Sequence, residues 1–230
     1  MSVKLQRYSD LITLVLLPVI LFIILIYYFK RNGYNLGIIS DNLGIISASF
    51  VAFISFILLR IGNRMTTIAV FNSDICGLLK IVEDLELITV YKDLYENPSN
   101  IRPGWSEYIK SSSEDYFTIF SKNSSNMGFL KPKTVSEITY FYLYLKCSRD
   151  ARRRLISWDQ EGVDEKDKKN DIKYTIKMMK QFIEHGIKAL ELLGFDDENQ
   201  LKNFRKLRDN EDVKKILGNQ DTTRNTGSIL

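Results

Sequence analysis

The first quarter of the 230-residue chain is dominated by two long apolar runs. Residues 11–28 read LITLVLLPVILFIILIYY, without a charge, which is long enough for a helix to cross the hydrocarbon core of a bilayer. The run ends in YYFKR, an aromatic and basic sequence typical of a membrane interface. A second apolar run covers 43–61 and is uncharged as far as Arg60. We therefore predict a two-helix transmembrane hairpin over residues 1–62.

The second run contains a duplicated segment, because NLGIISD at 35–41 is followed at once by NLGIISA at 42–48. A seven-residue period returns each residue to nearly the same face of a helix. Small residues recur on this predicted helix, and in lipid such a ridge lets helices approach closely. Packing against the first helix of the same chain and packing between copies in an oligomer both remain open. The predicted helix-packing or oligomerisation residues are Gly37, Ser40, Gly44, Ser47, Ala48 and Ala52.

Asp41 and Asn42 lie at the start of this second span. If the helix begins at Asn42 or Leu43, Asp41 is an interfacial cap residue, and we favour this interpretation because an acidic residue at a helix start is ordinary. If the helix begins at Leu36, the carboxylate lies about a turn and a half inside, where a bundle or a water-filled path must shield it. In that case Asp41 and Asn42 are candidate pore-mouth residues.

Apolar residues recur three or four apart through most of residues 63–217, which predicts an all-α soluble domain in the form of a helical bundle. Residues 218–230 bury too little to order and are expected to be a disordered tail. The predicted helices run from Arg64 to just before Asn97, from Trp105 to Phe120, from Thr134 through Trp158, from Ile172 to Leu193 and over 197–217.

Several local signals refine these helices. Thr134 and Glu137 match a capping box, and Gly194 followed by Phe195 matches a glycine C-cap. The polar segment from Ser121 to Asn126 is predicted to be a loop. The almost wholly charged segment from Asp159 to Asp171 is predicted to be an exposed connection.

The distribution of charged residues indicates the orientation of the chain in the membrane and the partners that it can bind. Most of the formal net charge of +4 belongs to residues 1–62, so the soluble domain is nearly neutral and direct nucleic-acid binding is not expected. Basic residues flank the hairpin at both ends more heavily than in its turn, which predicts a multi-pass membrane protein with both termini in the cytoplasm. Only two cysteines are present, which fits a reducing compartment.

The sequence holds no recognisable catalytic motif of the nucleotide-binding, hydrolase or metalloprotease kinds. His185 is the only histidine, which excludes a histidine-rich zinc site, and we interpret it as a structural residue. We therefore predict that the protein is not an enzyme and needs no cofactor or metal.

A cluster of four arginines lies near the end of the third predicted helix: Arg149, Arg152, Arg153 and Arg154. The helix dipole and solvation are enough to explain cations at a helix C-terminus. The functional alternative is an anion or partner site for lipid headgroups, a nucleotide or nucleic-acid phosphates. The aromatic run at 140–144 covers all faces of a helix, so we interpret it as core with interface.

A membrane hairpin feeding a cytoplasmic helical domain, in a chain rich in Ile, Lys, Asn and Tyr, resembles the small two-transmembrane effectors of bacterial anti-phage systems, such as those encoded beside retrons. The resemblance covers residues 8–62 and the helical character of the rest. It implies a toxin that a cytosolic protein or ribonucleoprotein partner holds silent. Release on infection would let the toxin self-associate and permeabilise the bacterial inner membrane.

Two other functions compete with this one. The chain can be a membrane-anchored adaptor whose helical domain recruits a cytosolic partner while the hairpin only tethers it. A weaker alternative is an anchored enzyme without a recognisable motif.

Overall fold

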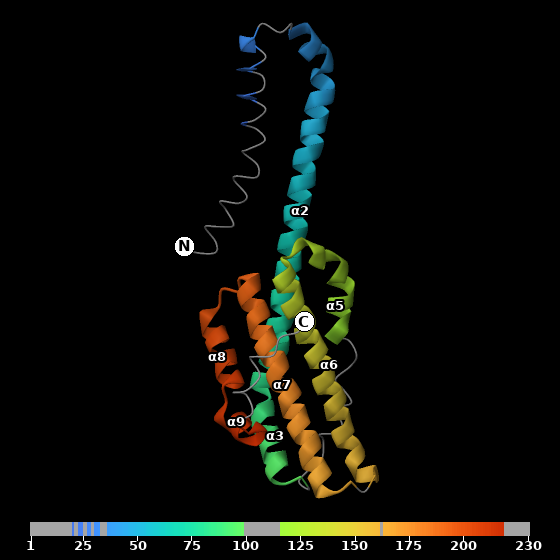
Figure 1. The fold of residues 1–230 in the computed structure, drawn as a ribbon, viewed down its shortest axis with the longest axis vertical. Helices are drawn as coiled ribbons and strands as arrows, with labels where there is room; N and C mark the ends of the chain where they lie inside the picture. Colours follow the sequence, from blue (N-terminus) through green and yellow to red (C-terminus); the bar gives the residue numbers. More distant parts are fainter. Residues whose placement is uncertain are drawn as a thin grey trace, which may run out of the picture. The chain divides into compact units, whose positions relative to one another are not determined.

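The computed structural model of this protein describes residues 20, 23–24, 27–28, 30–32, 36–98, 116–161 and 163–218, with the backbone alone at 36–47, at 116 and at 156–161. Within those ranges all regular structure is helical and none is strand, which confirms the all-α prediction (Figure 1). The chain divides into two compact units, Met1–Thr66 and Thr67–Leu230.

Helix α2 (Leu36–Asp84) has 49 residues, beginning in the first unit and ending in the second. The second predicted span, 43–61, lies wholly inside it. Because the helix begins at Leu36, the earlier of the two starts considered for this span is the one observed. The predicted continuation of the helix beyond Arg64 is also confirmed.

The first predicted span, 11–28, lies mostly outside the described residues. Five of its residues are described, and they are helical and exposed: Ile20, Ile23, Ile24, Tyr27 and Tyr28. No clear two-helix hairpin is present among the described residues of the first unit, so the paired arrangement stays a prediction.

The second unit is built around two long antiparallel helices, α6 (Pro132–Glu161) and α7 (Glu165–Leu193), which lie side by side (Figure 1). The C-terminal part of α2 packs against this pair. At Gly186 of α7, an added Cβ would lie 2.9 Å from Phe141 of α6 and 3.1 Å from Leu79 of α2. Glycine therefore permits a close approach of the three helices at this position.

Shorter helices complete the second unit around this three-helix centre, with α8 and α9 on the α7 side and α5 near α6 (Figure 1). They are α3 (Leu87–Glu96), α5 (Tyr116–Asn123), the 3-10 helix η1 (Ser124–Phe129), α8 (Glu198–Arg208) and α9 (Glu211–Leu217).

The apolar spacing in the sequence correctly predicted which face of α2 is buried in the second unit. Positions three or four apart from Ile68 to Val82 are in the core, whereas Leu85, which continues the same period, is 41% exposed. Leu85 lies in a break between α2 and α3 at which Glu86 has a left-handed backbone with φ 47°. The largest fully buried side chains are Phe71, Ile75, Leu79, Tyr91, Ile138, Phe141, Tyr142, Ile172, Ile176, Phe182 and Phe204.

The predicted end of α7 is confirmed in detail. Gly194 has φ 73° and ψ 42°, a conformation that glycine adopts without steric cost. Its N–H donates to the carbonyl of Glu191, and the N–H of Phe195 donates to the carbonyl of Leu190 at 2.9 Å. The pattern satisfies carbonyls that the last turn of a helix leaves without partners.

The predicted capping box at Thr134 is wrong. Helix α6 begins at Pro132, where the missing N–H of proline costs nothing in the first turn. Thr134 is therefore inside the helix and is 4% exposed. Glu137 is also one turn too far along to cap the helix start, and it contacts α7 instead.

Three predicted boundaries also differ from the structure. The segment from Ser121 to Asn126 is not a loop, because it forms the end of α5 and the start of η1. The charged segment 159–171 is largely helical, because α6 continues to Glu161 and α7 begins at Glu165, and charged residues are compatible with exposed helical turns. The single helix predicted over 197–217 is two helices, α8 and α9, separated at Asp209 and Asn210.

Candidate functional site

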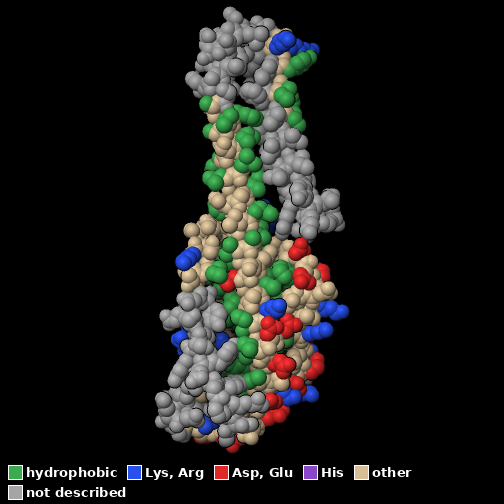
Figure 2. Space-filling model, turned by 180° about the vertical axis from the view of Figure 1, so that it is seen from behind, with side chains coloured by type: hydrophobic (Ala, Val, Ile, Leu, Met, Phe, Trp, Pro, Cys, Tyr) green, Lys and Arg blue, Asp and Glu red, His purple; other side chains and the backbone are tan. Residues whose placement is uncertain are grey.

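The most unusual surface in the described part of the chain is the N-terminal half of α2. From Ala48 to Leu59 the helix carries no charged residue. Five of its large apolar side chains face outward, and the exposed fractions are 63% for Val51, 51% for Phe53, 60% for Phe56, 52% for Leu58 and 64% for Leu59, whereas Ile57 is buried at 8%. Figure 2 shows green apolar side chains following this stretch, whereas the red acidic side chains lie on the second unit.

One helix in the described residues, Ala48–Asp84, is long and apolar enough to cross a membrane. Its C-terminal part cannot be the crossing segment, because Phe71, Ile75 and Leu79 are fully buried in the protein core. The exposed stretch before Arg60 is the part whose side chains face away from the protein. It therefore defines the candidate membrane segment.

The structure describes the predicted packing ridge only in part. Ala48 and Ala52 are exposed on α2. The other predicted ridge residues, Gly37, Ser40, Gly44 and Ser47, belong to α2 by their backbone, but their side chains lie outside the described part of the structure. Which helix this ridge contacts stays a prediction.

The favoured cap interpretation of Asp41 disagrees with the position at which α2 begins. The helix starts at Leu36, so Asp41 and Asn42 lie inside it rather than at its N-cap. With the helix starting at Leu36, the carboxylate of Asp41 would need a polar or aqueous environment within the membrane. The side chains of Asp41 and Asn42 lie outside the described part of the structure.

The four arginines do not form one basic surface. Arg149 and Arg152 are 6% and 9% exposed, whereas Arg153 and Arg154 face outward. They also lie in the middle of α6, which continues to Glu161, so the predicted stabilisation by the C-terminal end of the helix dipole is wrong.

Each of two arginines contacts an aromatic ring. The guanidinium of Arg149 lies 5.4 Å from the ring centre of Phe117, and one of its nitrogens lies 3.3 Å from Asp150. The guanidinium of Arg154 lies 5.2 Å from the ring centre of Tyr174 on α7. These contacts give Arg149 and Arg154 structural roles in the second unit.

His185 has a partner that the sequence analysis missed. Its Nδ1 lies 2.7 Å from Oε2 of Glu137, and the two side chains are 16% and 17% exposed. Tyr144 stacks on the imidazole with ring centres 5.2 Å apart, and Tyr140 lies at 5.1 Å. The spacing of 137, 140 and 144 places these three residues on one face of α6, but the sequence does not show that this face meets His185.

A second polar pair joins α2 to α6 inside the aromatic run. The hydroxyl of Tyr142 donates a hydrogen bond to Oδ2 of Asp74. Burial, followed by this hydrogen bond, raises the pKa of Tyr142 well above its usual range. The rings of Phe71 and Phe120 surround the phenol, with ring centres 6.3 Å and 4.8 Å away.

Burial confirms the core part of the prediction for the run at 140–144, and the interface part stays a prediction. Phe141 and Tyr142 are buried, whereas Tyr140 and Leu143 are 45% and 49% exposed.

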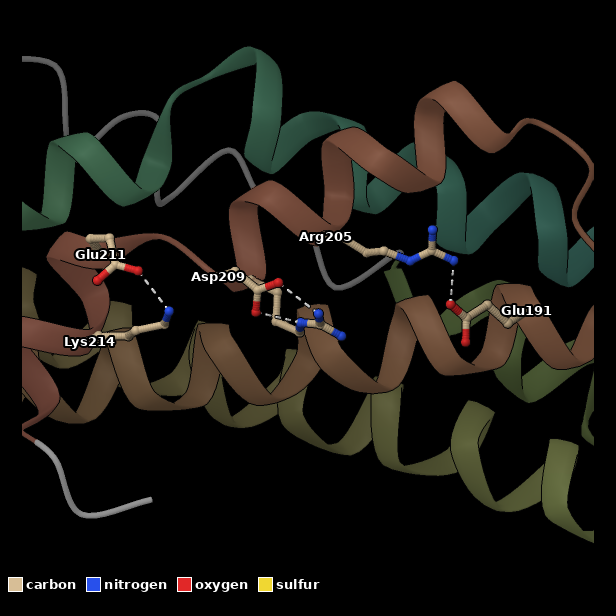
Figure 3. Close-up of polar contacts among 6 residues, drawn as sticks. Glu191, Arg205, Asp209, Glu211 and Lys214 are labelled. Carbon is tan, nitrogen blue, oxygen red and sulfur yellow. Dashed lines mark hydrogen bonds and ion pairs between the residues drawn. The ribbon is translucent and has the colours of Figure 1, made fainter. Parts of the chain in front are cut away.

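The outer surface of α7, α8 and α9 carries ordinary ion pairs. Arg205 of α8 contacts Glu191 of α7 at 2.7 Å, and Lys214 contacts Glu211 within α9 at 2.8 Å (Figure 3). Asp209 is paired with the neighbouring Arg208, and the hydrogen bond from that guanidinium lowers the pKa of Asp209. Exposed pairs of this kind stabilise a fold only slightly.

Among the described residues, no group of three or more His, Cys, Asp or Glu side chains could hold a metal ion. The predictions that the chain needs no cofactor and is not an enzyme stay predictions. No protein-family model, curated protein or solved structure matches this chain.

Proposed function

We propose that this protein is a membrane-inserted bacterial defence effector that self-associates and permeabilises the inner membrane when a cytosolic protein or ribonucleoprotein partner releases it. In this proposal it crosses the membrane more than once and keeps both termini in the cytoplasm. The observation that carries the membrane step is the uncharged, outward-facing apolar stretch of α2 from Ala48 to Leu59.

The physical support is the cost of leaving this stretch in water. Moving a large apolar side chain out of water contributes roughly 1.5–3 kcal/mol. Phe53, Phe56 and Leu59 are each more than half exposed. A contiguous apolar surface of this kind needs lipid or another apolar surface.

Permeabilisation, rather than simple anchoring, is supported by two features of the same helix. Ala48 and Ala52 continue the small-residue spacing of Ser40 and Gly44, which favours close helix association in lipid. The start of α2 at Leu36 places Asp41 inside the helix, where a carboxylate favours a water-filled path. An oligomer with Asp41 at its aqueous mouth accommodates both features.

The direct test expresses the full chain without its partner in bacteria that carry a potential-sensitive dye. We expect loss of the membrane potential as the wild-type protein accumulates. The double substitution Ala48→Ile and Ala52→Ile should preserve insertion but prevent close packing, so the potential should persist.

The matched control is Ile54→Phe, which adds bulk on the opposite side of α2 and should depolarise cells as the wild type does. Cells that retain their potential despite abundant membrane-inserted wild-type protein would contradict the permeabilising function.

A membrane-anchored adaptor is the alternative, and the exposed Tyr140 and Leu143 on α6 favour it, because such side chains suit a partner surface. Replacing residues 1–62 with an unrelated membrane hairpin separates the two functions. An adaptor should keep its activity after this exchange, whereas a pore former should lose it.

A further inference from the structure

Arg152 of α6 is a buried arginine among the described residues of the second unit. Its side chain is buried, with the whole residue 9% exposed, and its Nε has no hydrogen-bond partner. An arginine in a protein cannot discharge itself by losing a proton. A buried cation without a counter-charge costs several kcal/mol, so the site needs a compensating group.

Arg152 lines a small cavity of about 20 Å³. The rest of the wall consists of apolar side chains from α2, α3, α6 and α7, including Ile81, Met179 and Phe182. One turn earlier on the same face of α6, Ser148 is fully buried and its hydroxyl also lacks a partner. No described acidic residue lines the cavity.

The size and the lining together restrict what can occupy this space. About 10–15 Å³ is enough for one water, but a buried water is normally held by two to four polar partners. Here one guanidinium faces apolar walls, so a neutral water would leave the positive charge uncompensated. A small anion instead receives a charge-assisted hydrogen bond and neutralises the cation.

We propose that Arg152 binds a single small inorganic anion of halide size, such as chloride, in the cavity between α2, α6 and α7. The bound anion stabilises the fold of the second unit. This site is independent of the membrane-permeabilising function, and it concerns one buried arginine rather than a basic surface.

The test measures thermal unfolding of the full-length protein in detergent micelles at constant ionic strength, with sodium gluconate replaced stepwise by sodium chloride or bromide. Gluconate is too large for the cavity. An anion that binds only the folded state raises the unfolding midpoint with the logarithm of its concentration. At one hundred times its dissociation constant, the expected rise is about 5–10 °C.

Arg152→Met keeps much of the side-chain volume but removes the charge, so its midpoint should not respond to the exchange of gluconate for halide. Arg153→Met, on the exposed side of α6, is the matched control and should respond as the wild type does. If Arg152→Met does not fold, the uncharged Arg152→Gln serves as the second variant, and its midpoint should likewise not respond to halide.

Equal wild-type midpoints in gluconate, chloride and bromide would overturn the proposal. A full halide response in either folded Arg152 variant would also overturn it, because the anion would then bind elsewhere.

Discussion

Nδ1 of His185 on α7 lies 2.7 Å from Oε2 of Glu137 on α6, both side chains are largely buried, and the rings of Tyr140 and Tyr144 contact the imidazole. The only histidine of the chain thus joins the two central helices of the second unit. We interpret the pair as a structural contact between the two helices rather than a catalytic dyad, because the rings of Tyr140 and Tyr144 occupy the space next to the imidazole.

Replacing Glu137 by Gln should lower the free energy of unfolding by about 1–2 kcal/mol, since it weakens a largely buried, charge-assisted hydrogen bond. Denaturant unfolding of the full chain in micelles measures the effect. The control is Glu184→Gln, which alters the more exposed pair that Glu184 forms with Lys188 at 2.7 Å. That change should cost less than about 0.5 kcal/mol. Equal losses in the two variants would contradict a special role for the His185 pair.

Adding one methyl group at Gly186 should destabilise the second unit by about 1–3 kcal/mol. The new Cβ would lie 2.9 Å from two ring carbons of Phe141, which is itself fully buried and cannot move aside freely. Thermal unfolding of Gly186→Ala should show the lower midpoint.

The matched comparison is Gly77→Ala, because a Cβ at Gly77 of α2 meets nothing within 4 Å. Alanine is about 0.5–1 kcal/mol better than glycine in a helix interior, so this variant should be slightly more stable than the wild type. A stabilised Gly186→Ala protein would show that the three helices do not meet as closely as described.

Alkaline pH should weaken the fold through Tyr142. Its pKa is raised above the ordinary value of 10.0 in the folded state, so the unfolded chain loses the phenolic proton first. This contribution to stability is complete below pH 10 and is lost as the pH rises toward the higher folded pKa, by at most about 1.4 kcal/mol per pH unit.

Comparing unfolding between pH 9 and pH 11 checks this sign. Tyr142→Phe, which has no titrating phenol, should lose stability less steeply than the wild type. Tyr140→Phe serves as the control because Tyr140 is 45% exposed, and it should follow the wild type. Parallel curves for Tyr142→Phe and the wild type would rule out this origin of alkaline sensitivity.

Charges placed on the exposed face of α2 should prevent membrane insertion. An aspartate at the centre of a membrane helix costs about 2.5–3.5 kcal/mol during insertion. The double substitution Phe53→Asp and Phe56→Asp should therefore move the protein from carbonate-washed membranes to the soluble or aggregated fraction. Leu143→Asp, at an exposed site on α6, should leave the protein in the membrane. Wild-type protein that washes off with carbonate would contradict membrane insertion.

The helical class, the buried face of α2 and the end of α7 could all be predicted from the sequence. Residues from Ile68 to Val82 at helical spacing are buried, and Gly194 ends α7 in the expected left-handed conformation. These features depend on local periodicity and on backbone freedom, which neighbouring residues determine. Exact boundaries were less predictable, because a threonine and a glutamate three residues apart also occur inside a helix, as Thr134 and Glu137 do.

The polar contacts were decided only by the tertiary structure. The sequence identifies Glu137, Tyr140 and Tyr144 as one face of a helix. Their contact with His185 depends on how α6 and α7 pack, because Glu137 and His185 are 48 positions apart along the chain. In the same way, four neighbouring arginines suggest one basic patch, yet the helical turn directs Arg152 into the core and Arg153 to solvent. Residue order determined which groups the protein has, and packing determined which of them water can reach.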